Sequence, residues 1–417
     1  MTFRRLYKRC VSFAIQSFGT LLSLEWTTIF KSIVQSGHFM FSLPFHWEPS
    51  PDKMFSVGKL RVTRSKWRIS FAKMMVILSL LDCICRMHFA LVCDYGAMKD
   101  SELLEMYLEL FSRFGCGLLS IHPIFRPEYH VTLVNHLLKL DAVLKITTYL
   151  GNGVLSENLG MRLCLLFALP VGVLSPFLST LPAHFRSRHS GRFWGARFLP
   201  RWIYDSYPGV LCYAVYELFM VFSNTHNTTF LAPVVMIYAV INVTHIRLII
   251  SRKSFLMKSR LLRYQSLQIL NARYSEYFST IFWPIGQNTV YGCNVGVNVL
   301  FVLRHVDLGW SRFFACVACM VLVFVFEKYA ITGNARMYHE SKRFIQDVGV
   351  ARGCRNAAAS RVTCRSLRPI KVYVGRYYFF KMSTFTTYLA VLVDYTASVL
   401  IAINNFHAEH GLRKFKL

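Results

Sequence analysis

The chain has 417 residues, 54% of them hydrophobic, and a mean hydropathy of +0.37, which is too apolar for a soluble protein of this length. Its net charge of +27 would suit a nucleic-acid-binding protein, but most basic residues lie in the loops between long apolar segments. We therefore expect a membrane protein that has membrane lipids, and no nucleic acid, among its partners.

The N-terminal region, 1–69, begins with basic residues that are followed by an apolar stretch, 11–24. This order imitates a secretory signal peptide, but the stretch contains Gln16 and ends at Glu25 without a small-residue cleavage pattern. We interpret it as a helix that lies at the membrane surface or re-enters the membrane, within a cytoplasmic N-terminal segment.

Seven apolar stretches of membrane-spanning length follow. About 20 mostly apolar residues cross the hydrocarbon core as a helix, and backbone groups in lipid must be satisfied within helices. The stretches cover residues 70–92, 104–125, 161–183, 208–250, 279–303, 312–332 and 385–403. The predicted fold class is all-α, a polytopic membrane protein with seven transmembrane helices between 70 and 403.

The distribution of basic residues predicts the orientation of these helices. With a cytoplasmic N-terminus, the cytoplasmic segments hold 31 Lys and Arg residues, against 11 in the extracellular segments. The positive-inside rule requires this asymmetry. The segments 251–277 and 333–384 then form a cytoplasmic anchor that extends the helices, and 404–417 forms a short extracellular C-terminus. We expect a multi-pass protein of the plasma membrane.

The fourth stretch, 208–250, is about twice as long as one span. Splitting it around 224–227 would place the basic residues between 252 and 263 on the extracellular side, so a single crossing agrees better with the charge distribution. We expect one long helix that continues into the cytoplasm, with a kink at Pro233 that neighbouring helices accommodate.

The cytoplasmic segment 251–277 mixes apolar and basic residues. Leu267, Leu270 and Tyr274 recur at helical spacing, which places them on one face of a helix. A solvated loop does not need such a face, so we expect it to pack subunits or anchor helices together.

Ionisable residues within the apolar stretches are candidate functional residues, because each is costly in lipid unless it is paired or hydrated. Asp82 and Arg86 are four residues apart and can neutralise each other on one helix face, which is a structural role. Glu217 lies near Tyr213 and Tyr216, and this group suits contact with a small organic ligand. An ion pair within the protein is the alternative role for Glu217.

Motifs of enzymes and metal sites are missing from the sequence. It contains no P-loop, G-x-S-x-G or G-x-G-x-x-G motif. Cys316 and Cys319 form a C-x-x-C pair, but the pair lies inside an apolar stretch without a second Cys pair or a His, which indicates packing. We expect no enzymatic activity, no metal site and no cofactor.

The last apolar stretch contains a nine-residue pattern, in which Thr387 and Tyr388 precede five apolar residues and then Asp394 and Tyr395. This pattern resembles the C-terminal signature of insect gustatory receptors, where Thr-Tyr and five hydrophobic residues precede Gln-Phe. Asp394 and Tyr395 depart from the last two positions of that signature. Further segments resemble parts of the wider insect chemoreceptor superfamily, which includes odorant receptors: 37–45, 134–141 and 367–380.

The resemblance implies a ligand-gated, non-selective cation channel that detects a small-molecule tastant. It implies a homotetramer or heterotetramer with related receptors, in which four seventh helices meet around the pore. Asp394 would then contribute to a ring of carboxylates in the cation pathway. The alternative for Asp394 is burial against a basic residue such as Arg113. Thr387 and Tyr388 would hydrogen-bond across helices, or would anchor the helix end at the membrane interface.

Two other functions compete with this one. A seven-helix G-protein-coupled receptor would carry an Asp/Glu-Arg-Tyr motif after the third helix and an Asn-Pro-x-x-Tyr motif in the seventh, and neither motif is present. The departure at Asp394 and Tyr395 leaves room for a receptor-like subunit without channel activity of its own.

Overall fold

Long helices dominate the structure, a computed structural model, as the long apolar stretches predict. The all-α class is confirmed. The structure describes residues 26–49, 58–92, 100–148, 185, 199–251, 257–304, 310–350 and 367–409. The predicted surface helix, 11–24, and the predicted third span, 161–183, lie outside the described residues.

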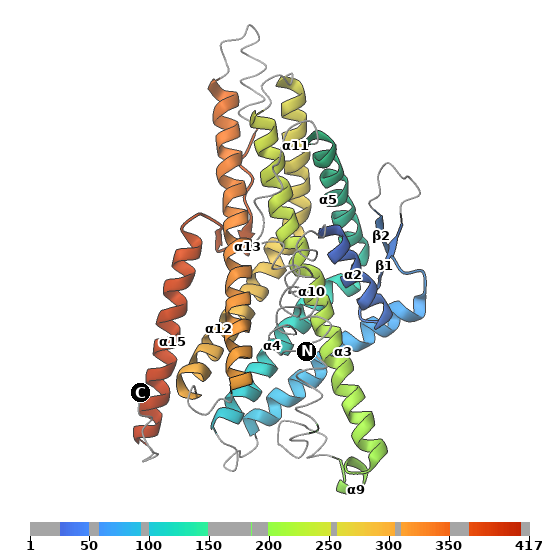
Figure 1. Cartoon of the computed structure of the whole chain (residues 1–417), viewed down its shortest axis with the longest axis vertical. Coiled ribbons are helices and arrows are strands. Elements are labelled where there is room, and N and C mark those ends of the chain that lie inside the picture. The colour runs from blue at the N-terminus through green and yellow to red at the C-terminus, as the bar shows by residue number, and fades with distance from the viewer. Residues whose placement is uncertain are drawn as a thin grey trace, which may run out of the picture.

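Two helices run along most of the length of the molecule, α10 (Tyr207–Ser251) and α13 (Trp310–Val350), and they pack against each other (Figure 1). The other long helices lie beside the lower or the upper half of this pair in the view of Figure 1. Beside the lower half lie α3 (Lys66–Val92), α4 (Asp100–Phe125), α12 (Trp283–Arg304) and α15 (Thr384–Glu409). Beside the upper half lie α5 (Pro127–Thr148) and α11 (Met257–Tyr274).

Helix α10 is continuous over its 45 residues, so the prediction of one long helix in place of two is confirmed. Three of the polar residues at 224–227, which suggested a break, are buried inside the helix bundle: Asn224, His226 and Asn227. Asn224 donates a hydrogen bond to the Ser79 hydroxyl of α3 at 2.7 Å, and Asn227 donates to the carbonyl of Ser223 at 2.6 Å. These bonds give the two side-chain amide groups partners for their N–H donors without a turn. Pro233 is buried, and the helix continues past it.

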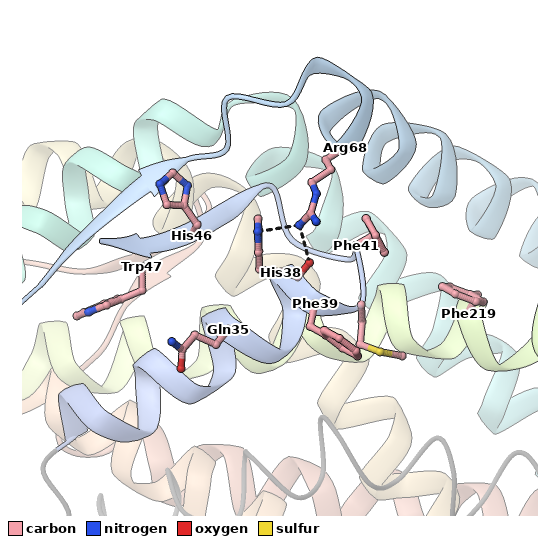
Figure 2. Close-up of a pocket in the computed structure, with 9 residues that line it drawn as sticks. Gln35, His38, Phe39, Phe41, His46, Trp47, Arg68 and Phe219 are labelled. Atoms are coloured by element: carbon pink, nitrogen blue, oxygen red, sulfur yellow. Dashed lines mark hydrogen bonds between the residues drawn. The ribbon is translucent and has the colours of Figure 1, made fainter. Parts of the chain in front are cut away.

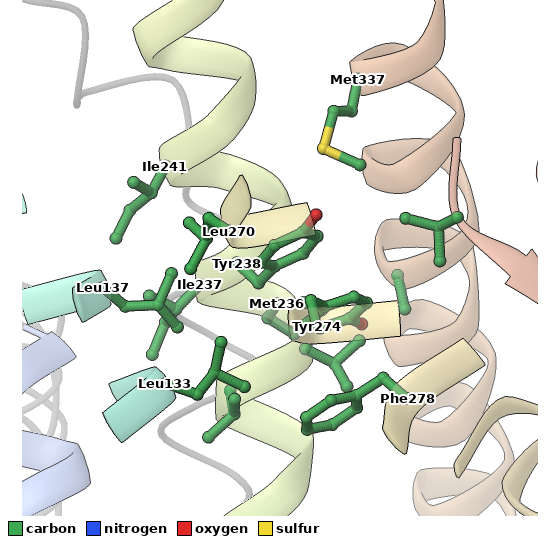
Figure 3. Close-up of a cluster of buried hydrophobic side chains, with 14 of the residues drawn as sticks. Leu133, Leu137, Met236, Ile237, Tyr238, Ile241, Leu270, Tyr274, Phe278 and Met337 are labelled. Atoms are coloured by element: carbon green, nitrogen blue, oxygen red, sulfur yellow. The ribbon is translucent and has the colours of Figure 1, made fainter. Parts of the chain in front are cut away.

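The core of the upper half is a cluster of apolar and aromatic side chains from α5, α10, α11 and α13 (Figure 3). Tyr238 of α10 stacks on Tyr274 of α11 with ring centroids 3.6 Å apart, and Tyr274 stacks on Phe278 at 4.5 Å. Leu133 and Leu137 of α5 close the cluster on the other side. The segments predicted as an anchor therefore pack into one body with the upper end of α10.

A π-helix, η3 (Ser275–Phe282), joins α11 to α12 without a break. Single π-helical segments inside longer helices often occur at functional sites. The Tyr277 hydroxyl donates a hydrogen bond to the Leu119 carbonyl of α4 at 3.0 Å. This bond fixes the π-helical segment against the end of α4, where the two halves of the molecule meet.

Several short elements were not predicted from the sequence. Helix α2 (Trp26–Phe39) precedes an antiparallel pair of strands, β1 (Phe45–Glu48) and β2 (Lys59–Val62). A second antiparallel pair, β3 (Tyr373–Val374) and β4 (Tyr378–Phe379), precedes α15. These strands are two to four residues long, too short for a period-2 pattern to stand out.

Among the described residues, two helices are long and apolar enough to cross a membrane, Tyr207–Ser251 and Thr384–Asn405. The first is mostly buried against other helices, whereas α15 leaves most of its surface exposed in the single chain. Four other predicted spans coincide with α3, α4, α12 with η3, and α13. The number of crossings remains a prediction.

The apolar face predicted on 251–277 packs inside the chain. Leu267, Leu270 and Tyr274 are at most 4% exposed, while Leu262 and Ile269 on the other side of α11 are 55% and 64% exposed. The expected packing of anchor helices is confirmed, and contact between subunits through this face remains untested.

Replacing Leu270 by Ala is expected to destabilise the protein by about 2–5 kcal/mol, because it opens a cavity in the core of the upper half. Thermal unfolding of the purified protein in detergent measures this loss. Leu262→Ala is the matched control, and its exposed side chain predicts a change within about 0.5 kcal/mol. Equal losses in the two variants would contradict the assignment of the packed face.

Candidate functional site

A buried ion network joins α3, α4 and α10 in the lower half of the molecule. Arg86 forms a salt bridge with Asp82 on the same helix at 2.8 Å and a second one with Glu217 of α10. Arg113 of α4 contacts the other oxygen of Glu217 at 3.0 Å and pairs with Glu109 at 2.5 Å. Glu217 therefore bridges two arginines from two different helices.

Burial explains why these charges are paired. The Glu217 side chain is fully buried, and both arginine side chains are less than a tenth exposed. A buried charge is costly unless opposite charges and hydrogen bonds compensate its lost hydration. The predicted pair of Asp82 and Arg86 is confirmed, and Glu217 has the ion pairs that were the alternative to ligand contact.

The two tyrosines predicted with Glu217 belong to the same network. The Tyr216 hydroxyl donates a hydrogen bond to the Asp82 carboxylate at 3.0 Å, and the Tyr213 hydroxyl bonds to Glu217. Tyr213 is buried and packs edge-on against Tyr204, while Tyr216 is half-buried. The structure thus brings together Tyr213, Tyr216 and Glu217 as the sequence predicted. In the structure, the polar atoms of these three residues bond to other side chains of the protein.

The signature residues at the C-terminal end lie on α15, which packs against α12 and α13. Tyr388 is the buried member of the set. Its hydroxyl accepts a hydrogen bond from the Asn294 amide of α12 at 2.9 Å and bonds to the Glu327 carboxylate of α13. Tyr388 therefore makes the interhelical hydrogen bonds that the sequence predicted. Thr387 does not, since its hydroxyl donates to the Ser383 carbonyl within α15 at 3.2 Å.

The exposed side of α15 carries a polar stripe on an otherwise apolar helix. Thr387, Asp394, Ser398 and Asn405 are exposed and are separated by seven, four and seven residues. With 3.6 residues per turn, these positions fall within about 40° of one another around the helix axis. The packed side, which contains Tyr388 and Leu392, lies on the other side of the helix. Asp394 is not buried against Arg113, because Arg113 pairs with Glu109 and Glu217.

A groove of about 780 Å³ opens between α12, the β3–β4 hairpin and the first half of α15. Tyrosines from all three elements line it, among them Tyr291, Tyr378, Tyr388 and Tyr395. The Tyr291 hydroxyl donates to the Val391 carbonyl at 2.8 Å, and its ring meets that of Tyr395 edge-on with centroids 5.7 Å apart. Tyr395 is thus held in the wall of the groove, although its side chain is 57% exposed.

Metal-binding geometry is absent from the described part of the chain. No group of three or more His, Cys, Asp or Glu side chains is arranged to hold a metal ion there. The charged groups of the ion network are acids and arginines in mutual contact, which is an arrangement for pairing and not for metal coordination.

Comparison with known proteins identifies the arrangement of helices. No family model matches the chain, and no curated protein matches its sequence. Two solved structures of the insect olfactory receptor OR5 from Machilis hrabei match its fold. One has a TM-score of 0.60 at 10% sequence identity and covers 90% of this chain and 97% of the receptor. The other, in complex with eugenol, has a TM-score of 0.57 at 13% identity and covers 91% and 100%.

The chain has the insect olfactory-receptor fold. The match extends over nearly the whole length of both proteins, so it includes the upper and the lower halves of the molecule and not one shared motif. The resemblance to insect chemoreceptors that the sequence indicated is confirmed at the level of the fold. The neighbours are receptors, in agreement with the prediction that this chain is not an enzyme.

Within the olfactory-receptor fold, sequence reasoning missed the partners of the candidate residues. Glu327 and Asn294 bond to Tyr388, and Arg113 bonds to Glu217. None of these three partners lies near the residue that it contacts in the sequence. A polar residue in an apolar stretch was the only available signal. Such a residue is a candidate for a functional or structural role, but the sequence does not predict which other helix its side chain contacts.

Proposed function

We propose that the chain is a subunit of a ligand-gated, non-selective cation channel that detects small organic molecules. The observation that carries the proposal is the olfactory-receptor fold over nearly the whole chain, with one of the matching receptors bound to eugenol. The spacing from Thr387 to Tyr395 favours the gustatory type, because it follows the gustatory-receptor signature. A small-molecule tastant is then the ligand.

The proposed pore lies where the α15 helices of four subunits meet, in a homotetramer or a heterotetramer with related receptors. Support comes from the exposed polar stripe, since a helix that faced only lipid would gain nothing from a carboxylate and an amide on its surface. Thr387 and Asp394 would face the pathway, and four Asp394 carboxylates would favour cations over anions. Tyr388 would hold α15 against α12 and α13, with Tyr395 in the wall of the adjoining groove.

The proposed ligand site lies beside the ion network, at the half-buried ring of Tyr216 and its neighbour Tyr213. Aromatic faces with few polar groups suit small organic ligands. Because Asp82 and the arginines already engage the hydroxyl and carboxylate groups, the ligand would contact mainly the rings. Glu217 would then position the helices around the ligand and act through them.

The proposed orientation places the N-terminal segment 1–69 and the anchor in the cytoplasm, and the C-terminal segment 404–417 outside the cell. Figure 1 supports it, because α5, α11 and the end of α13 share the upper end of the molecule, whereas α9 (Arg201–Tyr204) and the C-terminal end of α15 share the lower end. The transmembrane part, within 70–403, would then cross the plasma membrane seven times.

Epitope tags at the two ends test this orientation. We expect antibodies to stain a C-terminal tag on intact cells and to stain an N-terminal tag only after permeabilisation, because the cytoplasmic side carries the excess of basic residues. An N-terminal tag that is stained on intact cells would contradict the orientation and would favour a G-protein-coupled receptor.

Current recorded from cells that express this chain alone tests the channel function. We expect a cation current that begins when a tastant mixture is applied and that persists when G proteins are blocked with a GDP analogue in the pipette. A response that disappears with the block would support the coupled receptor. Surface expression without any current, restored by a related receptor, would support a receptor-like subunit that lacks channel activity of its own.

A further inference from the structure

A pocket of about 570 Å³ lies outside the sites described above, between the end of α2, strand β1 and the beginning of α3 (Figure 2). Its lining divides by chemistry. His38, His46 and Arg68 supply nitrogen atoms, and Phe39, Phe41 and Phe219 supply rings. In Figure 2, His38 and Arg68 point toward each other, and Phe219 lies apart from them on α10.

The polar end of the pocket gathers the guanidinium of Arg68 and the imidazole rings of His38 and His46. Arg68 Nη1 donates hydrogen bonds to the ring Nε2 of His38 at 2.7 Å and to the His38 carbonyl at 3.3 Å. The rings of His38 and His46 have centroids 6.1 Å apart. Burial, Arg68 and His46 together lower the pKa of His38 below its usual value. No carboxylate is among the described residues that line the pocket, so its cationic end lacks a counter-charge.

Phe41 packs beside the Arg68 guanidinium in an unusual backbone conformation. Phe41 has a φ of +57°, which is rare for a bulky residue, and such outliers gather at ligand-binding positions. The Arg68 guanidinium carbon lies 4.6 Å from the centroid of the Phe41 ring. Both hydrogen bonds to His38 leave from one nitrogen of Arg68, so its other N–H groups can donate to an oxygen of a ligand.

The apolar end of the pocket continues onto an exposed apolar surface of the protein. Phe39 is 77% exposed. Phe219 follows Leu211 and Val215 at intervals of four residues on α10, and these two are 51% and 44% exposed. The three side chains therefore form one apolar strip that leads away from the pocket along the helix.

We propose that this pocket binds one anionic phospholipid of the cytoplasmic leaflet. Its phosphate would accept hydrogen bonds from the Arg68 N–H groups that do not bond to His38, and an acyl chain would lie along Phe39 and Phe219. Arg68 lies two residues before the predicted span 70–92, which is the depth of the lipid headgroups. The cytoplasmic leaflet carries the anionic lipids that basic residues attract. The inference rests on the proposed membrane orientation, and its readout is bound lipid, which does not depend on a gated current.

Lipid binding to the purified full-length protein tests the inference. The protein in detergent is titrated with phosphatidylserine or phosphatidylcholine of identical acyl chains, and native mass spectrometry counts the lipids bound per subunit. We expect phosphatidylserine to bind more tightly, because its carboxylate gives the headgroup a net negative charge beside Arg68, whereas the headgroup of phosphatidylcholine is neutral overall. Arg68→Gln is expected to weaken phosphatidylserine binding about tenfold, the effect of one lost charge-assisted hydrogen bond.

Two further variants separate the pocket from general surface charge and from misfolding. Arg64→Gln removes an exposed arginine that does not line the pocket, and binding should stay within about threefold. Phe39→Ala changes an exposed side chain at the apolar end, so it should fold normally, weaken binding of phosphatidylserine and leave binding of inorganic phosphate unchanged.

Three results would overturn the proposal. Equal affinity for phosphatidylserine and phosphatidylcholine would show that the pocket does not prefer anionic lipids. An equal loss in Arg64→Gln and Arg68→Gln would assign the binding to the surface charge of the whole region. Binding of inorganic phosphate or of glycerophosphoserine as tight as that of phosphatidylserine would make the pocket a site for soluble anions and not for lipid.

Discussion

Replacing Glu217 by Gln is expected to destabilise the protein by about 1–3 kcal/mol, because Arg86 and Arg113 lose the shared carboxylate that accepts their buried hydrogen bonds. Glutamine has nearly the same shape, so the loss reports charge and not packing. Arg86 would retain Asp82 and Arg113 would retain Glu109, but no carboxylate of α10 among the described residues would then join the two arginines. The measurement is thermal unfolding in detergent, together with the fraction of protein that reaches the cell surface.

Controls for Glu217→Gln use residues of the same types. Glu276→Gln removes an exposed carboxylate at the start of η3, and its effect should be within about 0.5 kcal/mol. Tyr216→Phe removes the hydrogen bond to Asp82 and should cost about 1 kcal/mol. If Glu217→Gln leaves stability unchanged but abolishes the response to a ligand, the carboxylate contacts ligand directly and the bridging role is wrong.

The ion network shows what sequence reasoning reaches and where it stops. The pair of Asp82 and Arg86 follows from a spacing of four residues, because the period of one helix fixes it. The contacts of Glu217 with Arg86 and Arg113 join residues 131 and 104 positions apart. These contacts depend on how three helices are rotated relative to each other. The spacing of residues within one helix does not predict that rotation.

The long helices could be predicted from the sequence and the short strands could not, for a similar reason. The charge distribution favoured one crossing for 208–250, and α10 is indeed one helix. The β1–β2 pair depends on matching Phe45 to Val62 across a loop, and its strands of four residues give no period to detect. The proposed lipid pocket could not be predicted from the sequence for the same reason. Phe41 and Arg68 come into contact only because the chain turns between α2 and β1.

Helix α15 is the element whose proposed role depends most on the other subunits of the proposed tetramer. Its signature residues were identified from the sequence, and Tyr388 bonds across helices, which is one of the two roles expected for it and for Thr387. The stripe of Thr387, Asp394, Ser398 and Asn405 was also readable from helical spacing, but only packing shows that it lies opposite the buried side. Exposure of a carboxylate on an apolar helix is a reason to expect an aqueous pathway there.

Replacing Asp394 by Asn is expected to lower the single-channel cation conductance several-fold and to weaken the preference for cations over anions. A ring of carboxylates in a low-dielectric pathway raises the local concentration of cations by roughly tenfold or more, and the neutral amide removes that effect. Assembly and surface expression should stay normal, because Asp394 is exposed on α15 and Arg113 has other partners. Single-channel recording with cation and anion gradients measures both quantities.

Two comparisons decide whether Asp394 acts from within the pathway. Asp394→Gln installs the residue of the gustatory-receptor signature, and we expect a functional channel with the lower conductance of the neutral ring. Asp205→Asn removes an exposed carboxylate next to α9, at the same end of the molecule but away from α15, and should leave conductance and ion preference unchanged. Unchanged conductance in Asp394→Asn would exclude the residue from the pore. Loss of folding and surface expression in that variant would instead make Asp394 part of a buried contact between subunits.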